Sequence, residues 1–209
     1  MSTSIVHAAA EGGSVGRPRN PALDDVILEA VRAVLVECGY HALSVQEVTR
    51  RCNVHVRTIA RRWPTKAELV TAAVVGDGVR ATEPPRVTGR LRDDIQSLVE
   101  QSLRYLGEPA TRAAMPALMA EMGTNARVAA RLHRRQEELR ATVQIILQAA
   151  VDSGDAPKRI LNASALLPNL ITGAAFSFQF TEANPPSRLP INELTDLIVA
   201  AALGGQRSR

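Results

Sequence analysis

Residues 50–66 read RRCNVHVRTIARRWPTK, and the interpretation of the whole chain starts from this stretch. It holds six basic residues and no acidic one. Asn53 is typical of the left-handed end of a helix, and Trp63-Pro64 stops the helix expected over 55–62. A short cationic helix after a tight turn can dock into a phosphate-lined groove. The stretch therefore predicts the second half of a helix-turn-helix that binds DNA.

The residues around this stretch supply the other helices of such a motif. Residues 24–38 carry apolar side chains at the spacings of one helical face, and Gly39 is expected to end that helix in a left-handed conformation. The sequence Ser44-Val45-Gln46-Glu47 is a capping box that predicts a helix over 44–52. A second capping box, Thr65 to Glu68, predicts a fourth helix that runs toward Arg80.

The rest of the chain is also helical in pattern, after a Pro- and Gly-containing linker at 81–89. Helices are expected over 91–107, 109–123 (with Pro116 kinking it), 125–153, 162–181 and 191–203. No stretch predicts a strand. The fold class is therefore all-α, with a disordered tail (1–15), a three-helix DNA-binding head (16–72) and a helical regulatory and dimerisation domain (73–209).

Composition and charge agree with this division. Net charge is +4, and residues 16–72 contain nine basic and six acidic side chains, so most of the positive excess lies in the head. Aromatic residues make up only 3% of the chain, which argues against single-strand binding by base stacking. No arrangement of Ser/His/Asp, Cys/His or a phosphate-binding loop predicts an enzyme or a cofactor.

The sequence does not favour secretion, a membrane span, a redox switch or a metal site. Residues 1–15 lack the pattern of a signal peptide, and two cysteines without a CxxC motif suit a cytoplasmic protein. Cys38 and Cys52 fall on apolar positions, which favours burial over a redox switch. Cys38 and His41 lack the further ligands of a metal site. The uncharged residues 160–181 favour a helix buried in a subunit interface over a membrane span.

The head resembles the tetracycline-repressor (TetR) family of transcriptional regulators. The matching stretches are GRPR (16–19), ILEAVRAVLVECGYHALSVQEVTRRCNV (27–54) and RTIARRWPTKAEL (57–69). The resemblance implies a homodimer formed by the last two long helices, which grips double-stranded DNA and releases it when a small-molecule effector binds. Two departures concern the DNA contacts: Ala60 stands where the family usually has Tyr, and His55 where it usually has Ser.

The helix-turn-helix geometry assigns roles within the head. Arg57 is expected to read a guanine, since a guanidinium matches its two acceptors. Arg17 and Arg19 suit a minor-groove arm, although a disordered tether is an equal alternative. The remaining expected contacts to bases or phosphates are Ser44, Gln46, His55, Val56, Thr58, Arg61, Arg62 and Lys66.

The second domain offers a weaker prediction, an effector pocket of apolar character. Met115, Met119 and Met122 lie at helical spacing beside Pro116 and line either a core or an adaptable cavity. The other candidate lining residues are Tyr105, Leu118, Leu132, Leu170 and Phe176. Two further functions stay open: a ligand-independent DNA-binding dimer, and an enzyme or carrier with a vestigial head.

Overall fold

The computed structural model describes residues 21–76, 86–181 and 190–204, and this part of the chain is helical without a strand. The N-terminal helices are α1 (Pro21–Ala42), α2 (Val45–Cys52), α3 (Val56–Arg62) and α4 (Lys66–Val74). They are followed by α5 (Leu91–Gly107), α6 (Pro109–Glu121), α7 (Ala126–Asp152), the 3-10 helix η1 (Lys158–Ala165), α8 (Leu167–Phe180) and α9 (Ile191–Gly204). The predicted all-α fold is confirmed.

Local signals place the ends of the N-terminal helices where the sequence predicts them. Gly39 has φ 74° and ψ 176°, a positive φ that breaks the helical path of α1, although its ψ differs from the left-handed helical value. The amide of Glu47 donates to the Ser44 hydroxyl at 3.2 Å, and Asn53 ends α2 in the left-handed conformation. The amide of Glu68 likewise donates to Thr65 at the start of α4.

Helix α1 begins three residues earlier than predicted, and the helices predicted over 66–80 and 162–181 differ more. Helix α4 ends at Val74, before Gly76 at φ 83°, so it does not reach Arg80, which itself lies outside the described residues. The helix expected over 162–181 is divided, because Leu166 separates η1 from α8 and Pro168 can enter a helix only in its first turn.

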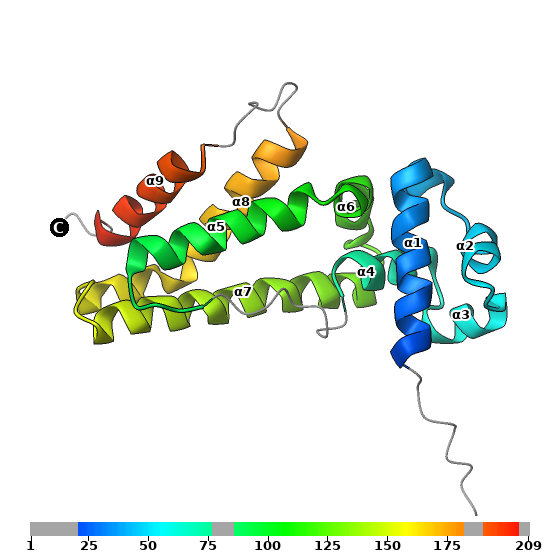
Figure 1. Ribbon diagram of the computed structural model, residues 1–209, viewed down its shortest axis with the longest axis horizontal. Helices are drawn as coiled ribbons and strands as arrows, with labels where there is room; N and C mark the ends of the chain where they lie inside the picture. Colours follow the sequence, from blue (N-terminus) through cyan, green and yellow to red (C-terminus); the bar gives the residue numbers. More distant parts are fainter. Residues whose placement is uncertain (1–20, 77–85, 182–189, 205–209) are drawn as a thin grey trace, which may run out of the picture.

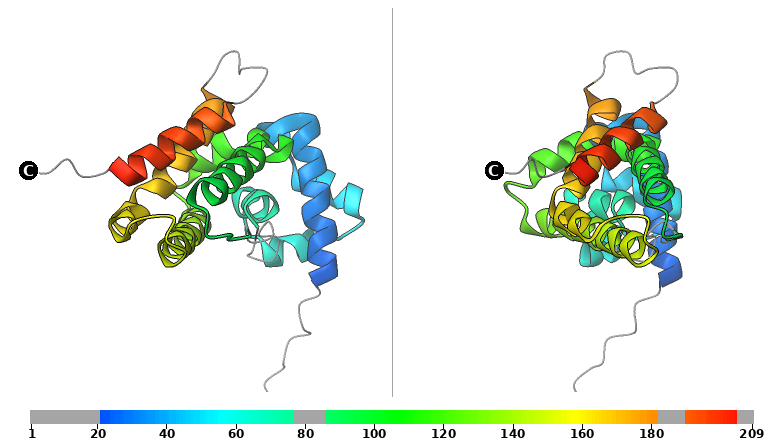
Figure 2. Two further views of the ribbon diagram at one scale, coloured as in Figure 1. Left: turned by 60° about the vertical axis from the view of Figure 1, so that its left-hand side comes forward. Right: turned by 90° about the vertical axis from the view of Figure 1, so that its left-hand side faces the viewer.

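The head lies at one end of the molecule and α5, α8 and α9 at the other, with α4 and α6 between them (Figure 1). In two further views, α8 and α9 lie beside α5, as their contacts require (Figure 2). Helix α6 packs against α1, and its buried Ala110, Ala114 and Leu118 join the same apolar core as the head. The head therefore does not have an apolar core of its own, because its core continues into the second domain.

Cys38 corrects one prediction, because its side chain is exposed, while Cys52 is half-buried against the core of the head. No cluster of metal-ligating side chains occurs within 21–76, 86–181 and 190–204. No single helix in these ranges is long and apolar enough to cross a membrane. Only the bent pair of η1 and α8, at 53° to each other, passes by length and composition.

Candidate nucleic-acid interface

Helix α3 turns one side to the core of the head and the other to solvent. Ile59 is fully buried, whereas Val56, Arg57, Ala60 and Arg61 are exposed and recur at three- and four-residue spacings. Val56 leaves 43% of its surface exposed, which is high for an apolar side chain. Such a surface, apolar and cationic at once, suits thymine methyl groups and the acceptors on guanine.

The residues before α3 extend this surface. His55 occupies the N-cap position of α3 without a side-chain hydrogen bond, so its exposed imidazole is not held by the helix end. Ser44 and Gln46 are exposed at the start of α2, and Thr58 is half-buried on α3. A hollow of about 270 Å³ separates α2 from α3 and is lined by Thr49, Arg50, Asn53, Val54, His55 and Val56.

Two of the predicted phosphate contacts have bonding partners within the head. The Lys66 ammonium donates to the carbonyl oxygens of Tyr40, His41 and Leu43 at 3.0, 3.2 and 3.3 Å. The Arg62 guanidinium forms an ion pair with Asp24 of α1, and the Arg62 side chain is only 11% exposed. The sequence pattern did not indicate these contacts because the partners, in α1 and at Leu43 just after it, are distant along the chain.

Two further arginines of the basic stretch are paired at the surface. Arg50 bonds Glu47 at 2.6 Å, and Arg51 bonds Glu37 at 2.6 Å. The Arg51 hydrogen bond holds the pKa of the Glu37 carboxyl below its usual range, so this pair stays charged near neutral pH. The charge of each arginine is therefore offset by an adjacent carboxylate.

Arg57 and Arg61 are the other two basic residues of the stretch 50–66. Among the described residues neither has an ion-pair or hydrogen-bond partner, and both are exposed on the same side of α3. Arg17 and Arg19 of the predicted arm lie outside the described residues. The structure therefore brings His55, Val56, Arg57 and Arg61 together on one exposed surface, with Ser44 and Gln46 at the start of α2.

The candidate pocket residues of the second domain are divided between two apolar cores. Tyr105, Met115 and Phe176 belong to the core formed by α5 to α9, whereas Leu118 and Met122 pack into the core that includes the head. Leu132 packs against both cores, and Met119 and Leu170 are 49% and 39% exposed. Within the described part of the chain, neither this 270 Å³ hollow nor a larger cavity beside α4 is lined by any of the eight.

A capped helix-turn-helix with an unpaired cationic side defines a DNA-binding transcriptional regulator. The chain matches the family described as bacterial regulatory proteins, tetR family, over residues 27–73. It also matches the tetracyclin repressor-like C-terminal domain over residues 85–198. The protein belongs to the TetR family.

Individual relatives agree with this assignment. The chain is 31% identical over 192 residues to an HTH-type transcriptional regulator of Mycobacterium tuberculosis H37Rv, with 90% of this chain and 93% of the relative covered. It is 32% identical over 95 residues to the regulator YdeS of Bacillus subtilis, which covers 44% of this chain and 46% of YdeS.

Solved structures share the fold at low identity. Salmonella enterica GusR has a TM-score of 0.61 at 18% identity, covering 90% of this chain and 98% of GusR. MexZ, a repressor of Pseudomonas aeruginosa, has a TM-score of 0.53 at 22% identity, covering 90% of this chain and 96% of MexZ. At these identities the likeness concerns the arrangement of the helices.

Proposed function

We propose that this TetR-family regulator is a cytoplasmic, homodimeric repressor that binds a near-palindromic operator and releases it when a small apolar or amphipathic effector binds. The observation that carries the DNA-reading role is the pair Arg57 and Arg61, the exposed cations of α3 that no acidic side chain neutralises within the described residues. In this role Arg57 reads a base and Arg61 contacts a phosphate. His55, Val56, Ser44 and Gln46 complete the surface.

The exposed apolar side chains of α8 and α9 support the homodimer. Leu166, before α8, is 60% exposed and Leu170 of α8 is 39% exposed. Leu197 and Leu203 of α9 are 70% and 36% exposed. A second copy that covers these side chains removes apolar surface from water and sets two α3 helices at the spacing of successive major grooves.

The proposed effector site lies in the core of the second domain, around Tyr105, Met115, Leu132 and Phe176. These side chains belong to or pack against one apolar core, and the Arg135 guanidinium lies 5.1 Å from the centre of the Tyr105 ring. The Tyr105 hydroxyl is buried and has no hydrogen-bond partner among the described residues. An effector that offers an acceptor there would bind one conformer more tightly and so shift the equilibrium between DNA-binding and released states.

The test is a footprint of the protein on the DNA that flanks its own gene, near physiological salt, with a matched pair of variants. Wild-type protein should protect a near-palindrome. Arg57→Ala should lose its preference for one base pair in each half-site, at a cost of about 1–3 kcal/mol. Arg104→Ala, which removes an exposed arginine of α5, should keep the wild-type footprint.

Three outcomes would count against the proposal. Equal weakening of binding on every sequence by Arg57→Ala would make Arg57 a phosphate contact. Protection without sequence preference in the wild type would contradict a specific regulator. An operator bound equally tightly in the presence of every amphipathic compound tried would favour a DNA-binding dimer that no ligand controls.

A further inference from the structure

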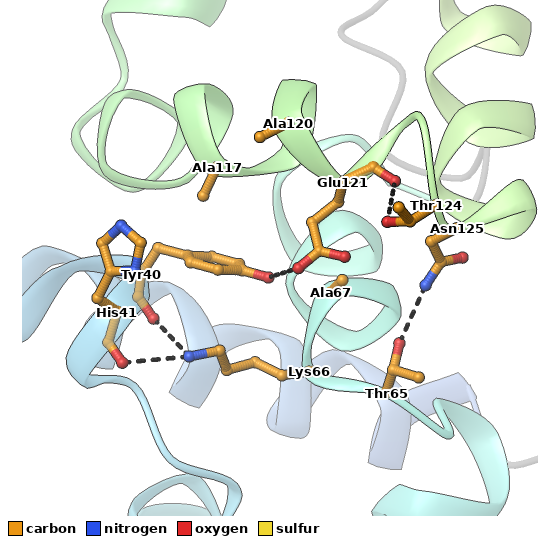
Figure 3. A pocket seen from close by; sticks show the side chains of 10 residues that line it. All are labelled: Tyr40, His41, Thr65, Lys66, Ala67, Ala117, Ala120, Glu121, Thr124 and Asn125. Carbon is orange, nitrogen blue, oxygen red and sulfur yellow. Dashed lines mark hydrogen bonds between the residues drawn. The ribbon is translucent and has the colours of Figure 1, made fainter.

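A cavity of about 630 Å³ lies where the head meets the second domain, apart from both the DNA-reading surface and the proposed effector site. Its lining comes from the end of α1 and the start of α4 on the head side. On the other side it comes from the end of α6 and the turn before α7. The lining residues are Tyr40, His41, Thr65, Lys66, Ala67, Ala117, Ala120, Glu121, Thr124 and Asn125 (Figure 3). The volume lies in the range of small-molecule sites.

Glu121 supplies the one carboxylate among the lining residues of this cavity. Glu121 is half-buried and has no ion-pair partner among the described residues. One of its oxygens accepts a hydrogen bond from the Tyr40 hydroxyl at 3.3 Å, which is long for a hydroxyl–carboxylate bond, and no hydrogen bond to the other oxygen occurs in the described part of the chain. Tyr40 and Glu121 point toward each other across the cavity (Figure 3). Glu121 therefore has capacity for a stronger donor.

The nearby cation does not satisfy this carboxylate. The three N–H groups of Lys66 match the three backbone carbonyls that it bonds, and its Nζ lies 4.6 Å from the centre of the Tyr40 ring. Lys66 points toward the backbone of Tyr40 and His41, away from Glu121 (Figure 3). An anionic ligand would thus meet Glu121 without gaining a free donor from Lys66.

The other walls suit the carbon skeleton of a ligand. Ala117 and Ala120 form a small apolar surface from α6, and the exposed His41 ring meets the Tyr40 ring edge-on with 5.7 Å between their centres. A half-buried carboxylate beside small apolar side chains can pair with the N–H donors of an organic ammonium ion while the apolar side chains contact its carbon groups.

We propose that this cavity is a second ligand site, which takes an organic ammonium ion with a short apolar group and pairs its N–H donors with Glu121. Because the walls belong to both the head and the second domain, a bound ligand contacts both parts at once. Its binding does not depend on the proposed effector site or on DNA.

The test uses three probes of one shape: 2-phenylethylamine, 2-phenylethanol and phenylacetate. Calorimetric titration of the full chain without DNA should show saturable binding of the amine, and weaker or no binding of the alcohol and the acid. Glu121→Gln keeps the size of the side chain and the acceptor for Tyr40, and should weaken amine binding about tenfold or more. Glu193→Gln, which changes an exposed carboxylate of α9, should bind the amine as the wild type does.

A second variant tests whether the amine binds in this cavity, independently of the charge of Glu121. Ala120 is exposed and lines the cavity, so Ala120→Phe should narrow it and weaken amine binding while Glu121 is retained. Equal affinity for the amine, alcohol and acid, or unchanged amine binding in both cavity variants, would overturn the proposal. Since no DNA is present, these results stand apart from success or failure of the operator footprint.

Discussion

At the scale of single residues, the basic stretch 50–66 separates into side chains that build the head and side chains that are free to meet DNA. Arg62 and Lys66 are engaged with α1 and its end, and Arg50 and Arg51 face glutamates. Net positive charge in the sequence therefore overstates the number of cations available to phosphates. Arg57 and Arg61, the unpaired arginines of α3, are therefore the residues of this stretch that we most expect to contact DNA.

Removal of Arg61 should change the salt dependence of DNA binding more than its sequence preference. We expect Arg61→Ala to weaken binding similarly on all sequences and to reduce the slope of log K against log salt by about 1, since one fewer phosphate is neutralised. Fluorescence anisotropy at several salt concentrations measures this, with Arg104→Ala as the control. A changed base preference at unchanged slope would instead place Arg61 on a base edge.

The buried hydroxyl of Tyr105 predicts that the protein becomes less stable at alkaline pH. Burial raises the pKa of Tyr105 to about 12, so the folded state disfavours the phenolate. The protonated phenol therefore contributes to the free energy of unfolding. This contribution is fully present below about pH 10, the ordinary pKa of tyrosine, and is lost as pH rises toward 12. Because the hydroxyl has no hydrogen-bond partner among the described residues, Tyr105→Phe should preserve stability near pH 7 and reduce its loss near pH 11 by about 1–2 kcal/mol.

Urea unfolding at both pH values checks this, with Tyr40→Phe as the matched control. Burial, followed by the charge of Glu121, also raises the pKa of Tyr40 to about 12, but its hydroxyl donates to Glu121. Tyr40→Phe should therefore cost about 1 kcal/mol near neutral pH, where Tyr105→Phe costs nothing. Equal destabilisation by both substitutions at neutral pH would show that the Tyr105 hydroxyl is bonded.

At the scale of helices, α3 has only seven residues and one fully buried side chain, Ile59, so other contacts must fix its position. The Arg62–Asp24 pair ties its last turn to the start of α1, the longest helix of the head. A largely buried ion pair positions its partners even where its net contribution to stability is small.

Removal of one partner of the Arg62–Asp24 ion pair should destabilise the protein more than replacement of both partners by apolar residues. We expect Asp24→Asn to destabilise the protein by about 1–3 kcal/mol, since Arg62 stays largely buried without its partner. The double variant Asp24→Leu/Arg62→Met should recover part of that loss. Asp25→Asn, at an exposed neighbouring position of α1, should be nearly neutral. Thermal unfolding measures the wild type and the three variants, and a double variant that is no more stable than Asp24→Asn would argue against coupling.

Signals that act within a few residues correctly predicted both ends of α2 and the start of α4. Ser44, Asn53 and Thr65 cap helices through their own backbone neighbourhood, so the sequence around them suffices. The break at Leu166 has a local cause in Pro168, whereas the exposure of Cys38 depends on how distant helices pack, which the local pattern does not contain. The same reason explains the pocket residues: spacing places Leu118 and Met119 on α6, but only packing assigns one to the core and exposes the other.

At the scale of the whole molecule, the head and the second domain are joined by a continuous core and by polar contacts around α4. The Arg127 guanidinium pairs with Glu68 at 3.0 Å, and the Asn125 amide donates to Thr65 at 3.4 Å. Any change in the second domain that moves the start of α7 therefore acts directly on α4. This route is how the proposed effector would change the spacing of two α3 helices in a dimer.

The dimer itself is testable through the most exposed large apolar side chain of α9. Leu197 is 70% exposed, and a proposed partner copy would cover it. We expect Leu197→Asp to yield a monomer in sedimentation measurements with unchanged helix content, because a charge in a desolvated interface is costly. The operator footprint should then be lost, since one head reaches only one half-site. Ile145→Asp, at a residue of α7 that is 59% exposed, should remain dimeric and bind DNA. A dimer that survives Leu197→Asp would mean that the two copies meet through another surface and that the exposed side of α9 serves a different partner.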